Sequence, residues 1–317
     1  MKLVTFVNNG IERIGAVDRA GRIVDLHAAY ASNLRQHDNN SGEDLLAAAV
    51  LGRDMIDFLK RGKKATDAAR KALTYAAENP NLAGDVSFDP KQVRLMSPLP
   101  RPGALISAGK NFSDHVAEMA SKKGPGAPVA FLKLPGTVIG PEDDIPYPPE
   151  VKNLDYEVEL AVIIGEPCIE VGVEEALDYV AGYAVFNDIS ARDVIRAENK
   201  FGIHLMGKSF PGFAPMGPYL VTADEIPDPQ NLKLRLSVNG EARQDSNLSY
   251  MIFKIRAMIA YWSQMGLNPG DVLTTGTPRG VAAGRKPEQT PWWLKSGDIV
   301  EAEVEKIGRL TNHVVAE

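Results

Sequence analysis

Residues 154–164 read LDYEVELAVII. The apolar run of this stretch predicts a buried β-strand, on which side chains two positions apart point to the same face. Glu157 and Glu159 are therefore expected to project together. A second apolar stretch, YAVFND at 183–188, ends at Asp188. Two like charges on one face near a third carboxylate need a cation between them.

Two interpretations of these glutamates stay open from the strand alone. On a solvated strand face, which is common in antiparallel sheets, both carboxylates would simply meet water. In a buried site they would need ion pairs or a metal, and residues 161–164 favour burial because they continue as AVII without alternation. Carboxylate oxygens suit hard ions, so Mg²⁺ or Mn²⁺ is then expected rather than zinc or copper.

The composition is that of an ordinary globular protein. Of 317 residues, 44% are hydrophobic and 24% are charged. The formal net charge of −6 argues against a nucleic-acid partner, which normally leaves a basic footprint. No stretch is long and apolar enough to cross a membrane or to act as a signal peptide, so a cytoplasmic protein is expected. Cys168 is the single cysteine, so no internal disulfide can form.

The N-terminal part is expected to form a lobe of its own. Residues 2–26 alternate apolar and polar positions around turn signals, which predicts short strands. Apolar residues at helical spacing follow at about 43–60 and 64–78. Residues 1–92 are therefore predicted to be a small N-terminal α/β domain.

The remaining residues, 93–317, are expected to be mostly β. Short β-like runs alternate with Gly and Pro there, and the 22 prolines of the whole chain make a helix-dominated body unfavourable. Helices are expected at 173–180 and at 249–265, where an apolar stripe is interpreted as core. The predicted fold class is α+β and predominantly β.

Four further motifs follow one another in this region. They are NDISARD at 187–193, GKSFPGFAPMGP at 207–218, TGTP at 275–278 and KSGDIVE at 295–301. Together with the carboxylates they make the chain, from about residue 98 to its end, resemble the fumarylacetoacetate hydrolase family. Several motifs in order are far more specific than any one of them.

The resemblance implies a mixed β-roll catalytic domain, usually a homodimer, that acts on a small 2-oxo or diketo acid. It also implies that Glu157, Glu159 and Asp188 hold Mg²⁺ or Mn²⁺. Family members cleave carbon–carbon bonds in acylpyruvates and related diketo acids, while relatives decarboxylate, isomerise or hydrate similar 2-oxo acids. The resemblance therefore implies the fold more firmly than the reaction.

The segment GKNFSDHVAE at 109–118 contains a candidate base. His115 and Glu118 are three residues apart, so they share a face on a single helical turn. A lone histidine is more often structural than catalytic, but a neighbouring carboxylate can fix its tautomer and raise its basicity. The pattern Asp-His-x-x-Glu resembles that of acylpyruvate hydrolases, which implies that the pair activates water.

Lys208 is the candidate for stabilising negative charge. A solvated lysine is the default interpretation, yet Lys208 precedes a Gly- and Pro-rich stretch where backbone and ligand can approach closely. By resemblance it lies near substrate oxygens and stabilises an oxyanion. The resemblance further implies that Thr277 hydrogen-bonds a substrate oxygen, and Lys110 and Lys133 are further candidates for substrate binding. Arg279 follows Thr277-Pro278, where smaller residues are frequent in the family, so it either binds a substrate carboxylate or faces solvent.

Residues 202–209, GIHLMGKS, match the spacing of a phosphate-binding P-loop. Such a loop must open a helix whose N-terminus faces the phosphates. The following FPGFAPMGP at 210–218 cannot continue as a helix. We interpret the match as chance and expect no nucleotide.

The expected reaction is metal-dependent hydrolysis of a carbon–carbon bond in an acylpyruvate or related 2,4-diketo acid. A decarboxylase, isomerase or hydratase at the same metal site is the alternative, and a catalytically idle metal- or metabolite-binding protein is the third. Ile195 stands where many family members have a glutamine that contacts substrate. This difference favours a more apolar or differently placed acyl group.

Overall fold

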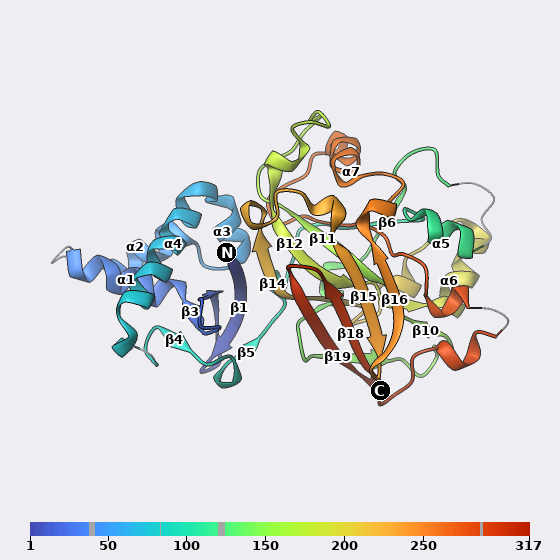
Figure 1. The fold of residues 1–317 in the computed structure, drawn as a ribbon, viewed down its shortest axis with the longest axis horizontal. Helices are drawn as coiled ribbons and strands as arrows, with labels where there is room; N and C mark the ends of the chain where they lie inside the picture. The colour runs from blue at the N-terminus through green and yellow to red at the C-terminus, as the bar shows by residue number, and fades with distance from the viewer. Residues whose placement is uncertain (38–41, 83, 120–123, 286–287) are drawn as a thin grey trace.

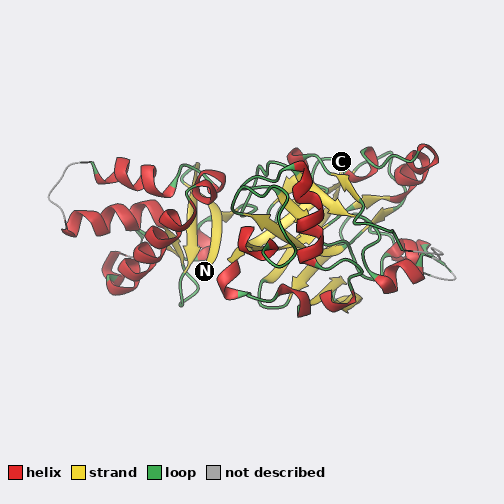
Figure 2. Ribbon diagram, turned by 90° about the horizontal axis from the view of Figure 1, so that it is seen from above, coloured by secondary structure: helices red, strands yellow, loops and turns green. Residues whose placement is uncertain are grey.

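Two large β-sheets, one small two-stranded sheet and helices that are concentrated in the N-terminal part form the described molecule (Figures 1 and 2). The computed structural model describes residues 1–37, 42–82, 84–119, 124–285 and 288–317. The α-helices are α1 (Leu26–His37), α2 (Glu43–Leu51), α3 (Met55–Lys60), α4 (Gly62–Glu78), α5 (Ser113–Glu118), α6 (Arg192–Glu198) and α7 (Ile255–Trp262). Within the described residues, no helix is both long and apolar enough to cross a membrane.

The strands are numbered in chain order. They are β1 (Lys2–Asn8), β2 (Ile11–Val17), β3 (Ile23–Asp25), β4 (Ser87–Phe88), β5 (Arg94–Leu95), β6 (Leu105–Ala108), β7 (Ala130–Leu132), β8 (Val138–Ile139), β9 (Asp144–Tyr147), β10 (Leu154–Asp155), β11 (Val158–Ile164), β12 (Val180–Asn187), β13 (Ser190–Ala191), β14 (Ala214–Thr222), β15 (Lys233–Val238), β16 (Glu241–Asn247), β17 (Val272–Thr274), β18 (Ile299–Val304) and β19 (Gly308–Ala316).

The larger sheet has twelve strands and joins the N-terminal part to the rest of the chain. Its order is β4-β3-β2-β1-β14-β12-β11-β17-β6-β7, with β5 beside β1 and β8 beside β14. β1 pairs antiparallel with β14, where Leu3 lies opposite Leu220. Leu3 also shares an apolar cluster with Phe58 of α3 and Phe186 of β12. The N-terminal strands thus continue the main sheet, and the domain boundary at residue 92 stays a prediction.

The smaller sheet has five strands in the order β16-β15-β18-β19-β9. Its strands β18 and β19 contact β12 and β14 of the larger sheet. Apolar side chains from both sheets, such as Val185 of β12 and Leu236 of β15, meet in one core cluster. Two mixed sheets with a shared core agree with the predicted α+β fold.

The structure corrects several helix predictions. The predicted helix at 43–60 is divided, because Gly52 has φ 85° and Asp54 begins α3 by accepting a hydrogen bond from the Asp57 N–H. The predicted helix at 173–180 is a 3₁₀ turn at Ala176–Tyr179 that runs directly into β12. The predicted helix at 249–265 is shortened to α7, whose apolar stripe is buried as expected.

Candidate active site

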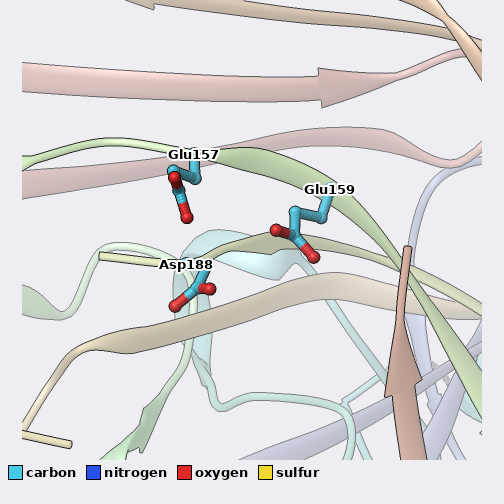
Figure 3. Close-up of side chains that lie close together, drawn as sticks. All are labelled: Glu157, Glu159 and Asp188. Carbon is cyan, nitrogen blue, oxygen red and sulfur yellow. The ribbon is translucent and has the colours of Figure 1, made fainter. Parts of the chain in front are cut away.

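Three carboxylates meet where β11 and β12 lie side by side. One carboxylate oxygen from each of Glu157, Glu159 and Asp188 lies within 4.8 Å of the others, and all three residues are buried. Figure 3 shows the three side chains directed toward a shared space. The interpretation of a solvated strand face is therefore wrong, because Glu157 is 5% and Glu159 is 1% exposed.

The backbone at this point departs from the single strand that the sequence predicted. The chain leaves β10 after Asp155 and enters β11 at Val158. In between, the Asp155 side chain accepts a hydrogen bond from the Tyr156 N–H, and the Asn187 side chain accepts one from the Glu157 N–H. These side chains replace strand partners, so the ladder is interrupted at Glu157. The two glutamates nevertheless converge, as predicted.

Two lysines lie against the carboxylates. Lys208 Nζ is 2.6 Å from Glu157 Oε2 and 2.7 Å from Asp188 Oδ2. Lys133 Nζ is 2.6 Å from Asp188 Oδ1. Burial opposes the charged form of both lysines. For Lys208 the neighbouring Asp188 and Glu157 outweigh burial, so the pKa of Lys208 is raised. For Lys133 burial prevails, so the pKa of Lys133 is lowered. Lys208 is thus a stable ammonium group.

The surroundings shift the pKa values of Glu157 and Glu159 in opposite directions. Burial opposes ionisation of Glu157, but Arg192 and Lys208 outweigh it and lower the pKa of Glu157. Burial, and then repulsion by Asp188 and Glu157, raises the pKa of Glu159 well above its usual value. Glu159 Oε2 accepts the Gly276 N–H at 2.9 Å, but no Lys or Arg in the described part of the chain forms an ion pair with Glu159.

The sum of the buried charges indicates whether a metal ion fits the site. Three carboxylates face the ammonium groups of Lys133 and Lys208, and Arg192 is balanced by Asp155, so one negative charge is uncompensated. A buried uncompensated carboxylate is costly. A divalent ion with oxygen ligands would remove that cost, and an all-carboxylate donor set suits Mg²⁺ or Mn²⁺. The residues present therefore fit such an ion.

The candidate base lies on the short helix α5. His115 Nδ1 is 3.4 Å from Glu118 Oε2, and both side chains are largely buried. The pair is close without the alignment of a hydrogen bond, since His115 Nδ1 has no hydrogen-bond partner among the described residues. The Gly280 N–H donates to both Glu118 oxygens, at 3.0 and 3.1 Å. The one-turn geometry predicted for His115 and Glu118 is present.

A cavity of about 350 Å³ joins the base to the carboxylates. His115, Lys208, Glu157 and Glu159 line one part of it, and Phe131, Val116 and Ile195 form an apolar wall. Its basic lining residues are Lys110, Arg192, Arg196, Lys208 and His204. The backbone of Lys110 has φ 54°, an uncommon value for a residue other than glycine.

The structure brings most of the predicted site residues together and leaves two apart. Lys110 and Thr277 line the cavity with the base and the carboxylates. The Thr277 hydroxyl donates to the Val158 carbonyl at 3.0 Å and accepts from Gln244 Nε2 at 2.9 Å, so it is already engaged within the fold. Lys133 is buried behind Asp188 and Arg279 is exposed, and neither lines the cavity. Their roles in substrate binding stay predictions.

Arg192 and Asp155 are two of the polar residues at the site for which no role was predicted from the sequence. Arg192 bonds Glu157 Oε1 through Nη2 and Asp155 Oδ2 through Nε, the latter at 2.7 Å. Asp155 lies within residues 154–164, and Arg192 lies within residues 187–193. A usable signal was the acidic residue two positions before Glu157, matched by a basic residue four positions after Asp188.

Comparisons with known proteins agree with this geometry. Residues 104–315 match the profile described as Fumarylacetoacetate (FAA) hydrolase C-terminal. A mitochondrial oxaloacetate tautomerase of Rattus norvegicus is 43% identical over 267 residues, which cover 84% of this chain and 81% of that protein.

Solved structures resemble the whole chain. Fumarylacetoacetate hydrolase from Exiguobacterium antarcticum has a TM-score of 0.77 and 33% identity, covering 100% of both chains. Maleylpyruvate hydrolase from Sphingobium sp. SYK-6, in complex with manganese(II) and pyruvate, has a TM-score of 0.72 and 28% identity, covering 100% of this chain and 99% of that chain.

Proposed function

Because this chain belongs to the fumarylacetoacetate hydrolase family and is an enzyme of keto acids, we propose that it interconverts the keto and enol forms of a short 2-oxo dicarboxylic acid such as oxaloacetate. Glu157, Glu159 and Asp188 would hold the Mg²⁺ or Mn²⁺ ion. The 43% identity to the rat oxaloacetate tautomerase supports this reaction over the others in the family.

The observation that carries the proposal is the surplus of positive charge in the cavity. Lys110 and Arg196 both line it, and neither forms an ion pair within the described residues. Arg196 Nη2 bonds only the uncharged side chain of Asn153. If the three carboxylates hold a metal ion, one carboxylate of a 2-oxo dicarboxylic acid would lie at that centre. Lys110 or Arg196 would then suit the second carboxylate.

His115 is the proposed base. When bound, the metal acts as a Lewis acid that polarises the 2-oxo group and acidifies the neighbouring carbon. Since Glu118 lies at Nδ1 of His115, we expect Nε2 to remove a proton from C3, and Glu118 to stabilise the resulting imidazolium. The C3–H electron pair forms the C2–C3 double bond, and the C2 carbonyl π pair passes to the oxygen. The imidazolium then returns its proton to the C2 oxygen, directly or through one water, which completes the enol and restores neutral His115.

Lys208 supplies fixed charge rather than proton transfer. Its Nζ forms ion pairs with Glu157 Oε2 at 2.6 Å and with Asp188 Oδ2 at 2.7 Å, which favour the ammonium form. Its Nζ also lies 4.8 Å from the centre of the Phe131 ring, which lines the same cavity. A positive charge at this place stabilises the negative charge that develops on the 2-oxo oxygen.

Hydrolysis of an acylpyruvate is a second candidate, favoured by the pairing of His115 with Glu118. The same base could take a proton from water, whose hydroxide would attack the distal carbonyl, and the leaving group would be the same type of enolate. The apolar wall of Phe131, Val116 and Ile195 could receive an acyl group. The similar maleylpyruvate hydrolase supports this reaction.

A direct assay separates the two candidates. With Mn²⁺ or Mg²⁺, the protein should speed the loss of enol absorbance from oxaloacetate, and a chelator should abolish the effect. His115→Ala should lower turnover by about 10²- to 10⁴-fold, the usual contribution of a general base, and leave Mn²⁺ affinity nearly unchanged. Pyruvate release from acylpyruvates without any tautomerase activity would instead establish the hydrolase.

The role of Arg196 has a matched control in Arg235. Arg196→Ala should raise KM for oxaloacetate, while Arg235→Ala should leave KM unchanged because Arg235 is exposed on β15 and lies outside the cavity lining. Equal KM values for wild type and Arg196→Ala would remove the argument for a dicarboxylic substrate.

A further inference from the structure

Asp155 is a buried carboxylate that contacts two separate parts of the site. Its Oδ2 accepts from Arg192 Nε at 2.7 Å. Its Oδ1 accepts from the Ala282 N–H at 2.8 Å, and Oδ2 also accepts from the Ala283 N–H at 3.1 Å. The carboxylate is 0% exposed, so these contacts take place away from water.

Asp155 is linked to the carboxylates of the candidate metal centre through Arg192. Arg192 bonds Asp155 with Nε and Glu157 Oε1 with Nη2, so one planar guanidinium spans both carboxylates. Its side chain is 12% exposed. The orientation of Glu157 is therefore tied to that of Asp155, since a guanidinium presents its donors in a rigid fork.

Asp155 is linked to the candidate base through the segment 280–284. The segment 280–284, which contains Ala282 and Ala283, also contacts Glu118 at two points. The Gly280 N–H donates to the Glu118 carboxylate, and a Cβ at Gly284 would lie 2.2 Å from Glu118 Cδ. The position of this segment therefore decides where Glu118 lies relative to His115.

We propose that Asp155 is a positioning residue that couples the metal centre to the base. When Glu157 is fixed by a bound ion, Arg192 and Asp155 are fixed with it, and Asp155 holds segment 280–284 where Glu118 can orient His115. The inference deepens the proposed function and rests on it for its catalytic meaning. The coupling itself is a property of the hydrogen-bonded chain and can be measured without substrate.

The test is hydrogen exchange of the amides in segment 280–284 with and without Mn²⁺. In the wild type, Mn²⁺ should slow this exchange. In Asp155→Asn, the amide nitrogen cannot accept from Arg192 and the Ala283 N–H, so the slowing by Mn²⁺ should be lost. Mn²⁺ affinity, measured by calorimetry, should fall about 10-fold, as is usual for residues that orient metal ligands.

Asp271→Asn is the matched control. Asp271 is a buried carboxylate that also accepts two backbone N–H groups, from Ala104 and Asn268 at 2.7 Å each, and it has no bond to Arg192 or segment 280–284. This variant should keep both the Mn²⁺ affinity and the slowing of exchange. A purely structural role for Asp155 would speed exchange equally with and without Mn²⁺ and leave the affinity unchanged, which would overturn the proposal.

If Asp155→Asn does not fold, Arg192→Lys tests the same hydrogen-bonded connection between Glu157 and segment 280–284. A lysine keeps the charge but cannot span Asp155 and Glu157 with a rigid fork. The slowing of exchange by Mn²⁺ should again be lost, and its persistence in this variant would also overturn the coupling. A protein that shows the coupling but no tautomerase activity would refute the proposed function alone.

Discussion

Glu157 and Glu159 are two residues apart and face one space, yet their environments give them opposite tendencies to ionise. Arg192 and Lys208 outweigh burial and lower the pKa of Glu157, whereas burial, Asp188 and Glu157 together raise the pKa of Glu159. A metal ion can bind only the ionised carboxylate, so it competes with a proton at Glu159. Lys208 meanwhile occupies one oxygen of Glu157.

Metal binding is therefore expected to depend on pH through Glu159. Between its usual pKa of 4.5 and the raised value, metal-free folded protein holds a proton that the unfolded chain has lost. Stability without metal should fall as pH rises through this window, because the folded state binds more protons. Mn²⁺ affinity should rise over the same window. The lowered pKa of Glu157 acts only below 4.5 and does not oppose this trend. Burial lowers the pKa of Lys133, whose contribution to stability runs in the opposite direction between its lowered pKa and 10.5.

Calorimetry in buffers of different ionisation enthalpy measures the protons released when Mn²⁺ binds. Release should be detectable within the window and should disappear above the raised pKa of Glu159. Glu159→Gln should bind Mn²⁺ more weakly and release fewer protons. Proton release that is the same in Glu159→Gln and wild type would contradict the assignment of the proton to Glu159.

For single residues, the sequence was most informative where spacing alone brings side chains together. The i, i+2 spacing of Glu157 and Glu159 and the i, i+3 spacing of His115 and Glu118 predicted neighbours that the structure contains. Arg192 could not be placed in the same way. Its partners, Asp155 and Glu157, are 37 and 35 residues away, and their contact depends on the break between β10 and β11.

Among the elements, the short helix α5 and the 3₁₀ turn Ala282–Gly284 depend on close contact with each other. A Cβ at Gly284 would lie 2.2 Å from Glu118 Cδ, and the end of that flexible side chain would have to move. Gly284→Ala should therefore displace Glu118 from His115. Small misplacements of catalytic groups can lower activity by on the order of 10²-fold, and we expect a loss of kcat approaching that size.

Gly136→Ala is the control for this substitution, because a Cβ there would meet no atom within 4 Å. Both variants should retain the wild-type melting temperature to within a few degrees, since a flexible side chain can move at little cost. Wild-type kcat in Gly284→Ala would show that the position of Glu118 does not limit catalysis.

Element boundaries were the least predictable part of the fold. The stretch at 154–164, interpreted as a single strand, gave no sign that the Asp155 and Asn187 side chains would bond the backbone and split it into β10 and β11. The helix α1 was not predicted, because its inward side chains are small or scattered, as Leu26, Ala29 and Ala31 illustrate. Packing against α2 and α4 stabilises it instead.

For the whole molecule, the continuous twelve-stranded sheet ends at an edge strand, β7. Exposed apolar side chains gather on this strand and on the segment that follows α6. Leu132 is 58% exposed and Phe201 is 81% exposed, and the ring of Phe131 in β7 contacts His204, which links the two segments. An exposed apolar edge of this kind is expected to pair with another chain.

We therefore expect this edge to mediate the homodimer that the family resemblance implies. Light scattering after size exclusion should give twice the chain mass of 34.3 kDa for the wild type. The double substitution Leu132→Glu and Phe201→Glu should give a monomer, because it places two carboxylates in an apolar contact. Leu45→Glu changes an equally apolar side chain, 79% exposed on α2 in the N-terminal part, and should leave the mass unchanged. A dimer that survives the double substitution would place the interface elsewhere on the molecule.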